Sequence, residues 1–217
     1  TDISKIDGLA RLRLNSIEPG YLDDALIRFA AASPIFCRHF HVPLQSGDDK
    51  ILKRMGRHYN RAYYAERIER IATLIPDCAI GADVMVGFPG ETEDQFAQTK
   101  ALLCDLPITY LHIFPYSLRE GTAAERLGDH LEKGTKKQRA RELIALSEKK
   151  RLAFHQRFVG QRLQILTEGR QDPVTGLQVG LSDNYIKALF TGTAANNTLI
   201  DIEVEQARED LVFGAQI

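Results

Sequence analysis

Cysteine is scarce in this sequence, whose 217 residues include Cys37, Cys78 and Cys104 and no others. No two of them form a CxxC or CxxxC pair, so they are poor material for a metal site, and an odd number does not suit a disulfide framework. We therefore expect free thiols of a reducing compartment, packed as small hydrophobic side chains.

Long apolar runs and a charge excess are also missing. No run approaches membrane-spanning length and no charged-then-apolar leader opens the chain, so we expect a cytoplasmic protein that contacts no membrane. The net charge of -1 does not by itself favour nucleic acid. Locally, however, residues 133–157 hold nine Lys or Arg against Glu142 and Glu148. A polyanion should meet that segment first.

Four short segments alternate as strands do, and each runs into a proline. They are Arg11–Leu14, Phe36–Val42, Ala79–Val86 and Ile108–Phe114, followed by Pro19, Pro43, Pro89 and Pro115. Proline cannot donate to a ladder, so it suits the end of a strand. Helix-start patterns occur at Ser46–Asp49, Asn60, Thr92–Gln95 and Thr122–Glu125. The succession predicts parallel βα units, whose ligands bind at the carboxyl ends of the strands.

A change of character near Val159 predicts a second domain. Thr135–Gln138 opens a long helix that reaches about Phe158. Five strand-like segments without helices follow, at Leu163–Leu166, Gly176–Val179, Asn184–Phe190, Leu199–Val204 and Leu211–Phe213. We predict an α/β fold with about four parallel βα units in residues 1–158, and a small five-stranded barrel in residues 159–217.

The turn after the third strand is the first candidate for a site. Gly87–Thr92 offers backbone amides and a helix N-terminus, which suit a phosphate, a carboxylate or a ribose hydroxyl. An ordinary Pro-Gly turn with a helix cap has the same sequence. Asp83, within the strand, is costly to bury unless it is paired, so it either anchors a ligand or ties a neighbouring loop.

Other polar residues lie at the predicted strand ends. Gln45 and Ser46 follow the second strand, and Ser46 is also expected to cap the next helix. Glu18 and Arg119 could clamp an amino-acid ligand or pair with each other. His39 and His41 share a strand face and could chelate a metal. Because no third ligand has a recognisable spacing, we interpret them as hydrogen-bonded histidines that line the barrel.

Five motifs in order carry a family resemblance: "RLRLNSIEP", "HFHVPLQSGDDKILKRMGRHY", "DVMVGFPGETEDQF", "LHIFPYSLREGTAAERL" and "GLSDNYIKALF". Together they closely resemble the radical S-adenosylmethionine (SAM) methylthiotransferases over nearly the whole chain. "SIEP", "PLQSG" and "FPYSLREGT" look most like the branch that acts on threonylcarbamoyladenosine beside the tRNA anticodon. One sister branch modifies isopentenyladenosine in tRNA, and another modifies a ribosomal protein.

The resemblance implies a radical SAM (TIM-like) barrel of six βα units, followed by a TRAM domain, an OB-like barrel that binds tRNA. It also implies SAM and two 4Fe-4S clusters, with a 5′-deoxyadenosyl radical that starts the conversion of the nucleoside to its 2-methylthio derivative. The family's CxxxCxxC triad, which holds the SAM-binding cluster, does not occur in this sequence. The matched strands correspond to the last four of six. We therefore expect a C-terminal fragment, inactive alone and without bound cofactor.

Residue roles follow from the same resemblance. The cofactor-binding positions it implies are Glu18, Gln45, Ser46, Asp83, Tyr116 and Arg119. In the small barrel it implies that Asn184, Tyr185 and Lys187 face the tRNA anticodon stem-loop, through a Tyr that stacks and a Lys that meets phosphate. The basic helix that ends at Arg157 should add positive charge. The truncated sheet would have one bare parallel edge, which predicts self-association.

Two other functions stay open. The chain could be a non-catalytic RNA-binding protein that kept the scaffold and lost the triad. It could also belong to an ordinary (β/α) barrel enzyme that uses Glu18, Asp83 and His112 for proton transfer.

Overall fold

The computed structural model describes residues 3–217, which form two compact units. The sheet unit consists of Leu14–Ala32 and Phe40–Ser147. The described residues of the barrel unit are 3–13, Ser33–His39 and Glu148–Ile217. No helix in the described part of the chain has both the length and the apolar character that crossing a bilayer requires.

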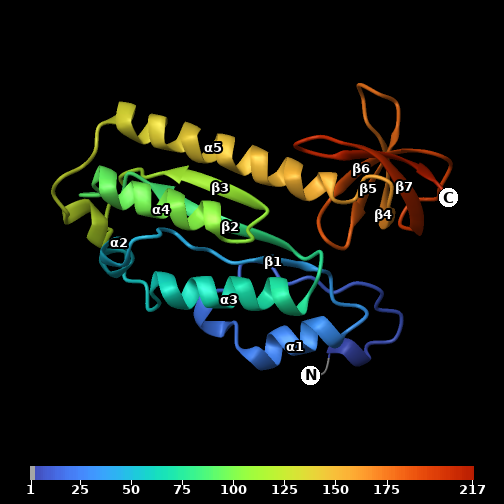
Figure 1. The fold of residues 1–217 in the computed structure, drawn as a ribbon, viewed down its shortest axis with the longest axis horizontal. Helices are drawn as coiled ribbons and strands as arrows, with labels where there is room; N and C mark the ends of the chain where they lie inside the picture. The colour runs from blue at the N-terminus through green and yellow to red at the C-terminus, as the bar shows by residue number, and fades with distance from the viewer. Residues whose placement is uncertain (1–2) are drawn as a thin grey trace. The chain divides into compact units, whose positions relative to one another are not determined.

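The sheet unit contains a three-stranded sheet. Its strands lie in the order β1 (His39–His41), β2 (Ala79–Val86) and β3 (Tyr110–Pro115) (Figure 1). β2 and β3 run parallel, as predicted, and their register places Asp83 opposite His112. The helices are α1 (Asp24–Ala32), α2 (Asp49–Arg54), α3 (Arg61–Leu74), α4 (Glu93–Asp105) and α5 (Lys133–Gln156), the last of which continues into the barrel unit. Short 3-10 helices occur at Pro19–Tyr21 and Ala123–Arg126.

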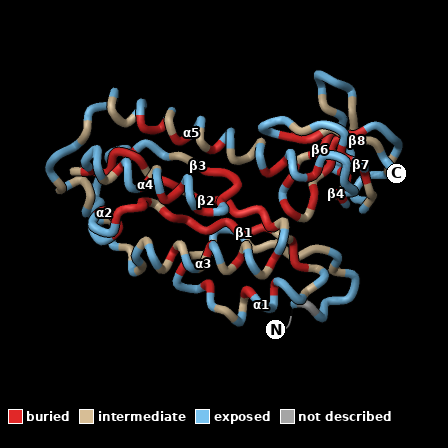
Figure 2. The backbone as a smooth tube through the Cα atoms, in the orientation of Figure 1, coloured by how far each residue is buried: buried red, intermediate tan, exposed pale blue. Residues whose placement is uncertain are grey.

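Burial explains the strands of this sheet. β2 is mostly apolar and almost wholly buried, as expected for a parallel strand that is covered on both faces (Figure 2). Tyr64 of α3, Phe96 of α4 and Phe40 of β1 are among the largest fully buried side chains. Two predicted helix starts are confirmed. Asn60 accepts a hydrogen bond from the Tyr63 amide at 2.8 Å, and Thr92 forms a complete capping box with Gln95.

Three local predictions were wrong. Arg11–Leu14 forms only an isolated bridge, from Leu12 to Phe36, in place of a strand. The cap of α2 is Asp48, which accepts from the Ile51 amide at 3.0 Å, and Ser46 lies two residues too early. The capping-box pattern at Thr122 begins only a 3-10 turn, and the Thr122 side chain caps no amide.

The barrel unit contains a closed five-stranded barrel in the order β4-β5-β6-β8-β7, which confirms the predicted small barrel. Its strands are β4 (Arg162–Gln171), β5 (Gln178–Ser182), β6 (Lys187–Thr191), β7 (Leu199–Ala207) and β8 (Val212–Gln216). β6 and β8 are parallel, and the other neighbours are antiparallel. Alternate residues along these strands, such as Ile165, Ile202 and Val204, fill the interior.

Candidate functional site

Backbone amides of the turn after β2 donate hydrogen bonds to other groups of the protein. Gly87 and Gly90 have φ values of +72° and +74°, which glycine adopts at little cost. The Gly87 N–H donates to a Glu91 carboxylate oxygen at 2.7 Å, and the Gly90 N–H donates to the Asp129 carbonyl at 2.8 Å. The Thr92 N–H donates to the Gln95 side chain at 3.0 Å. The ordinary turn with a helix cap is thus the correct reading, because these amides are not open to a ligand.

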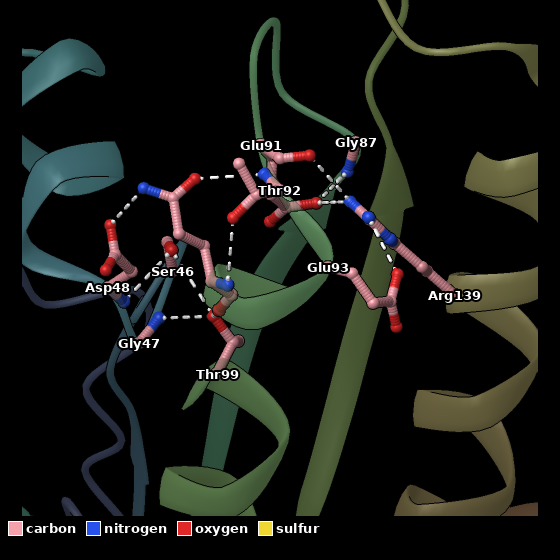
Figure 3. Close-up of polar contacts among 10 residues, drawn as sticks. Ser46, Gly47, Asp48, Gly87, Glu91, Thr92, Glu93, Thr99 and Arg139 are labelled. Carbon is pink, nitrogen blue, oxygen red and sulfur yellow. Dashed lines mark hydrogen bonds and ion pairs between the residues drawn. The ribbon is translucent and has the colours of Figure 1, made fainter. Parts of the chain in front are cut away.

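A buried ion pair completes this turn (Figure 3). Glu91 is 3% exposed and Arg139 of α5 is 4% exposed. Arg139 Nη1 lies 2.7 Å from Glu91 Oε2, and Nη2 lies 3.0 Å from the exposed Glu93. Burial raises the pKa of the Glu91 carboxyl, while hydrogen bonds from Gly87 and Arg139 act in the opposite direction. The pair therefore ties α5 to the turn.

The loop after β1 packs against α4 (Figure 3). Ser46 is fully buried, and its hydroxyl lies 3.4 Å from the Thr99 hydroxyl. The Gly47 amide donates to Thr99 at 2.9 Å, and a Cβ on Gly47 would lie only 2.6 Å from the Thr99 Cα. Gln45 is half-buried with φ of +67°, and its amide donates to the Asp83 carbonyl at 2.8 Å. Of the two predicted ligand-binding residues in this loop, only Gln45 keeps an available side chain.

Asp83 is paired with two histidines. His41 Nε2 lies 2.8 Å and His112 Nδ1 lies 3.3 Å from the same oxygen, Oδ1. The other ring nitrogen of His41 is 3.3 Å from the hydroxyl of Tyr110. His41 is buried, Asp83 is half-buried and His112 is exposed. Sequence reasoning named each of these residues but missed the group, since the sheet register and the β1–β2 pairing bring them together.

Among the described residues, the remaining predicted cofactor residues are not the ion-pair partners of Asp83, which are His41 and His112. Glu18 pairs with Arg57 at 2.6 Å and not with Arg119, which is exposed. Tyr116 is buried and meets Phe88 edge to face, with ring centroids 5.6 Å apart. Its hydroxyl has no hydrogen-bond partner among residues 3–217. An unpartnered buried hydroxyl is costly, so Tyr116 retains a free polar group for a ligand or water.

Tyr185 forms an exposed aromatic platform in the barrel unit. It lies in the turn before β6 with φ of +67° and is 47% exposed. The Arg13 guanidinium lies 4.6 Å from its ring centroid, and the His39 ring lies 4.4 Å away on centroids. Lys187 begins β6 nearby in sequence and is half-buried. These groups suit stacking on a base and contact with phosphate.

The other predicted RNA residues differ in exposure. Asn184 is fully buried, and its side-chain oxygen lies 2.5 Å from the Ser182 hydroxyl, so it shapes the turn that presents Tyr185. Arg157 is exposed after α5, with its guanidinium 5.5 Å from the Phe154 ring. Arg11 and Arg38, which the sequence did not single out, also bind the 181–183 segment, at Leu181 and Asp183.

The three cysteines are free thiols, as predicted. Cys37 and Cys78 are buried, but Cys104 is exposed and does not pack as a hydrophobic side chain. Burial raises the pKa of the Cys37 thiol, which disfavours the reactive thiolate.

Comparison with known proteins places these features in a family. Residues 3–103 match the model of the Radical SAM superfamily. The chain is 35% identical over 192 residues to the threonylcarbamoyladenosine tRNA methylthiotransferase MtaB of Bacillus subtilis, covering 88% of the chain and 43% of that protein. It is 36% identical over 214 residues to the tRNA-2-methylthio-N(6)-dimethylallyladenosine synthase of Desulfitobacterium hafniense, covering 98% and 48%. The chain is thus similar, over most of its own length, to the radical SAM methylthiotransferases.

Two further matches bear on the extent of this family relationship. MtaB of Rickettsia prowazekii is 40% identical over 200 residues, covering 90% of the chain and 46% of that protein. The chain thus spans about half the length of these methylthiotransferases. Coproporphyrinogen III oxidase (HemN) of Escherichia coli, a radical SAM enzyme, superposes with a TM-score of 0.54 at 17% identity over 64% of the chain and 32% of HemN. That likeness concerns the fold alone.

The similarity to radical SAM methylthiotransferases implies SAM and iron-sulfur clusters. The residues of this chain fit SAM better than they fit a cluster. Cys37, Cys78 and Cys104 are too dispersed to supply the thiolates of a 4Fe-4S cluster. Toward SAM, the Asp83 carboxylate is 21% exposed and the Tyr116 hydroxyl is unpartnered, so both fit a polar ligand. Ser46 and the amides of Gly87, Gly90 and Thr92 are already engaged within the protein.

Proposed function

We propose that the protein to which this chain belongs is a radical SAM methylthiotransferase that modifies tRNA. The observation that carries the proposal is the match of 36% identity over 98% of the chain to a tRNA-2-methylthio-N(6)-dimethylallyladenosine synthase. That match includes both the sheet unit and the barrel unit. We further propose threonylcarbamoyladenosine beside the anticodon as the substrate, on the basis of "SIEP", "PLQSG" and "FPYSLREGT". Isopentenyladenosine in tRNA is the alternative, because relatives of both kinds match at similar identity.

In this proposal the sheet unit orients SAM, which supplies the radical chemistry when it is bound. The Asp83 carboxylate would accept hydrogen bonds from polar groups of SAM, and the Tyr116 hydroxyl would donate one to SAM. Gln45 is proposed as a further contact. Glu18 and Arg119 are proposed at the amino-acid end, where Arg57 already holds Glu18 in place. Ser46 acts indirectly, by fixing the loop that carries Gln45. The clusters of the family would require cysteines outside these residues.

The barrel unit is proposed as a TRAM-like tRNA-binding module. Tyr185, with Arg13 over its ring, would stack on an unpaired base. Lys187 and Arg157 would contact phosphate, and Asn184 would hold the turn. The alternative of a non-catalytic RNA-binding protein makes the same surface prediction, so only an assay of the reaction separates the two.

The test is mass spectrometry of tRNA nucleosides from cells that lack the complete gene. We expect loss of 2-methylthio-threonylcarbamoyladenosine, restored by the intact gene and not by an Asp83→Asn version of it. Loss of 2-methylthio-isopentenyladenosine instead would assign the alternative substrate. An unchanged nucleoside profile would overturn the proposal and leave RNA binding, which a gel-shift assay of the Tyr185→Ala variant would then address.

A further inference from the structure

The sheet unit carries a group of two imidazoles and one carboxylate that the proposed cofactor chemistry does not use as a unit. His41 Nε2, Asp83 Oδ1 and His112 Nδ1 all lie within 4.8 Å of one another. They come from all three strands of the sheet, β1, β2 and β3. We propose that His41, Asp83 and His112 bind a first-row divalent metal ion such as Zn²⁺.

The spacing of the three atoms suits one metal ion. Two ligands bound to the same tetrahedral zinc, at bond lengths near 2.0–2.2 Å, are separated by about 3.3 Å. His112 Nδ1 and Asp83 Oδ1 are already 3.3 Å apart, and His41 Nε2 and Asp83 Oδ1 are 2.8 Å apart. The His41–Asp83 pair must therefore widen by about 0.5 Å, and His112, whose side chain is 51% exposed, has room to rotate toward the other two atoms.

The surroundings of His41 resemble those of a metal ligand. A metal-bound imidazole usually donates its second N–H to an oxygen, which fixes the tautomer. His41 Nε2 donates to Asp83 in the structure, and once a metal ion replaces that proton the Tyr110 hydroxyl, 3.3 Å from His41 Nδ1, is in position to accept the proton of Nδ1. Tyr110 reaches this place over Gly81, because a Cβ there would lie 2.2 Å from the phenol carbon Cζ. The contact between Tyr110 and His41 therefore depends on the glycine at position 81 of β2.

The donor set selects the kind of ion. Two nitrogens and one carboxylate suit Zn²⁺, Co²⁺ or Fe²⁺, whereas Mg²⁺ and Ca²⁺ prefer oxygen ligands. Three protein ligands leave a coordination position open to water or a small molecule. His112 provides the route of entry, since it is exposed while His41 is buried.

The test is calorimetric titration of the metal-stripped 217-residue chain with Zn²⁺, supported by visible absorption with Co²⁺. We expect one Zn²⁺ per chain, Co²⁺ d–d bands that report nitrogen and oxygen ligands, and no binding of Mg²⁺ at the same concentration. His112→Gln should lose at least about tenfold in affinity, and Asp83→Asn at least as much. Tyr110→Phe should weaken binding by about 10- to 100-fold while the stoichiometry stays at one.

The matched control is His58→Gln, which removes an exposed histidine far from the three strands in sequence and should bind Zn²⁺ as the unchanged chain does. Circular dichroism before titration identifies any variant that is not folded, and His112→Gln, at an exposed site, keeps the test informative. Absence of Zn²⁺ binding by the unchanged chain, or equal binding by the His112→Gln variant, would overturn the inference. Either result would leave the methylthiotransferase proposal intact, because that proposal does not depend on this ion.

Discussion

At the scale of single residues, Glu91 and Arg139 form a buried ion pair whose contribution to stability can be measured. Their side chains are 1% and 5% exposed, so each charge depends on the other for compensation. Replacing Arg139 with Met keeps the volume but leaves the Glu91 carboxylate without its partner. We expect a loss of about 3–5 kcal/mol in the free energy of unfolding, measured by urea titration.

Glu93 supplies the control for this measurement. It pairs with the same guanidinium, but its side chain is 76% exposed. Glu93→Gln should therefore change stability by about 1 kcal/mol or less. If Arg139→Met and Glu93→Gln have equal effects, the buried pair does not stabilise the turn.

His155 makes a pH-dependent contribution to the free energy of unfolding. Burial lowers its pKa, as does the charge of Arg151, while its hydrogen bond to the Arg208 carbonyl and the nearby Asp210 act in the opposite direction. Because the unfolded state takes up a proton below pH 6.5 before the folded state does, stability is full above that pH and falls on acidification. The slope contributed by this histidine cannot exceed about 1.4 kcal/mol per pH unit.

Urea unfolding at a series of pH values from 7 to 5 tests this expectation. His155→Gln should remove the His155 contribution and flatten the profile in that interval. A profile that keeps its slope in the variant would assign the pH dependence to other groups.

Among the secondary-structure elements, the packing of β3 against β2 depends on Gly81. Gly81 lies opposite Tyr110 in the register, and the phenol ring covers it. Gly81→Ala should destabilise the protein by about 1–3 kcal/mol, because the ring must move. Thermal unfolding measures this loss, and Gly128→Ala, where no atom lies within 4 Å of the new Cβ, should cost little. Combining Gly81→Ala with Tyr110→Ala should cost less than the sum, and strict additivity would contradict the account.

Elements with strong local signals could be predicted from the sequence. The Thr92 capping box, the Asn60 cap and the apolar run of β2 each carry their own physical cause, and all occur as expected. Helix α1 was missed although Asp23 accepts a hydrogen bond from the Leu26 amide at 2.7 Å, a cap signal that precedes Asp24–Ala32. Polar and apolar residues alternate in Arg11–Leu14 as they do in a strand. In the structure, however, the two arginines of this segment donate to carbonyls of the 181–182 segment. Local sequence does not contain that distant partner.

The candidate site was predictable residue by residue but not as an arrangement. Asp83 could be recognised as a carboxylate that needs a partner, yet its partners His41 and His112 depend on strand order and register. Ser46 and the Gly87–Thr92 turn were plausible ligand groups in sequence. The structure engages them through Thr99 and Glu91, whose contacts require the packing of α4 on the loops.

For the whole molecule, we predict association through an edge of the sheet. The outer edge of β3 is covered at Leu111, whose amide donates to Ser147 of α5 at 2.8 Å. Beyond it, His112, Phe114 and Pro115 are exposed. We predict that the chain self-associates through this edge, with an average mass that rises with concentration in sedimentation experiments. Phe114→Lys should lower that association, and a chain that stays monomeric throughout would contradict the prediction.

The two arginines near the start of the chain also bear on how the protein is made. Arg11 is joined to Leu181, 170 positions later. At about 5–20 residues per second, a ribosome needs roughly 10 to 30 s to deliver that carbonyl after the guanidinium has emerged. During this interval the segment around Arg11 must wait without its eventual acceptor, exposed to chaperones and proteases, and the barrel unit reaches its final form only after Leu181 has been synthesised.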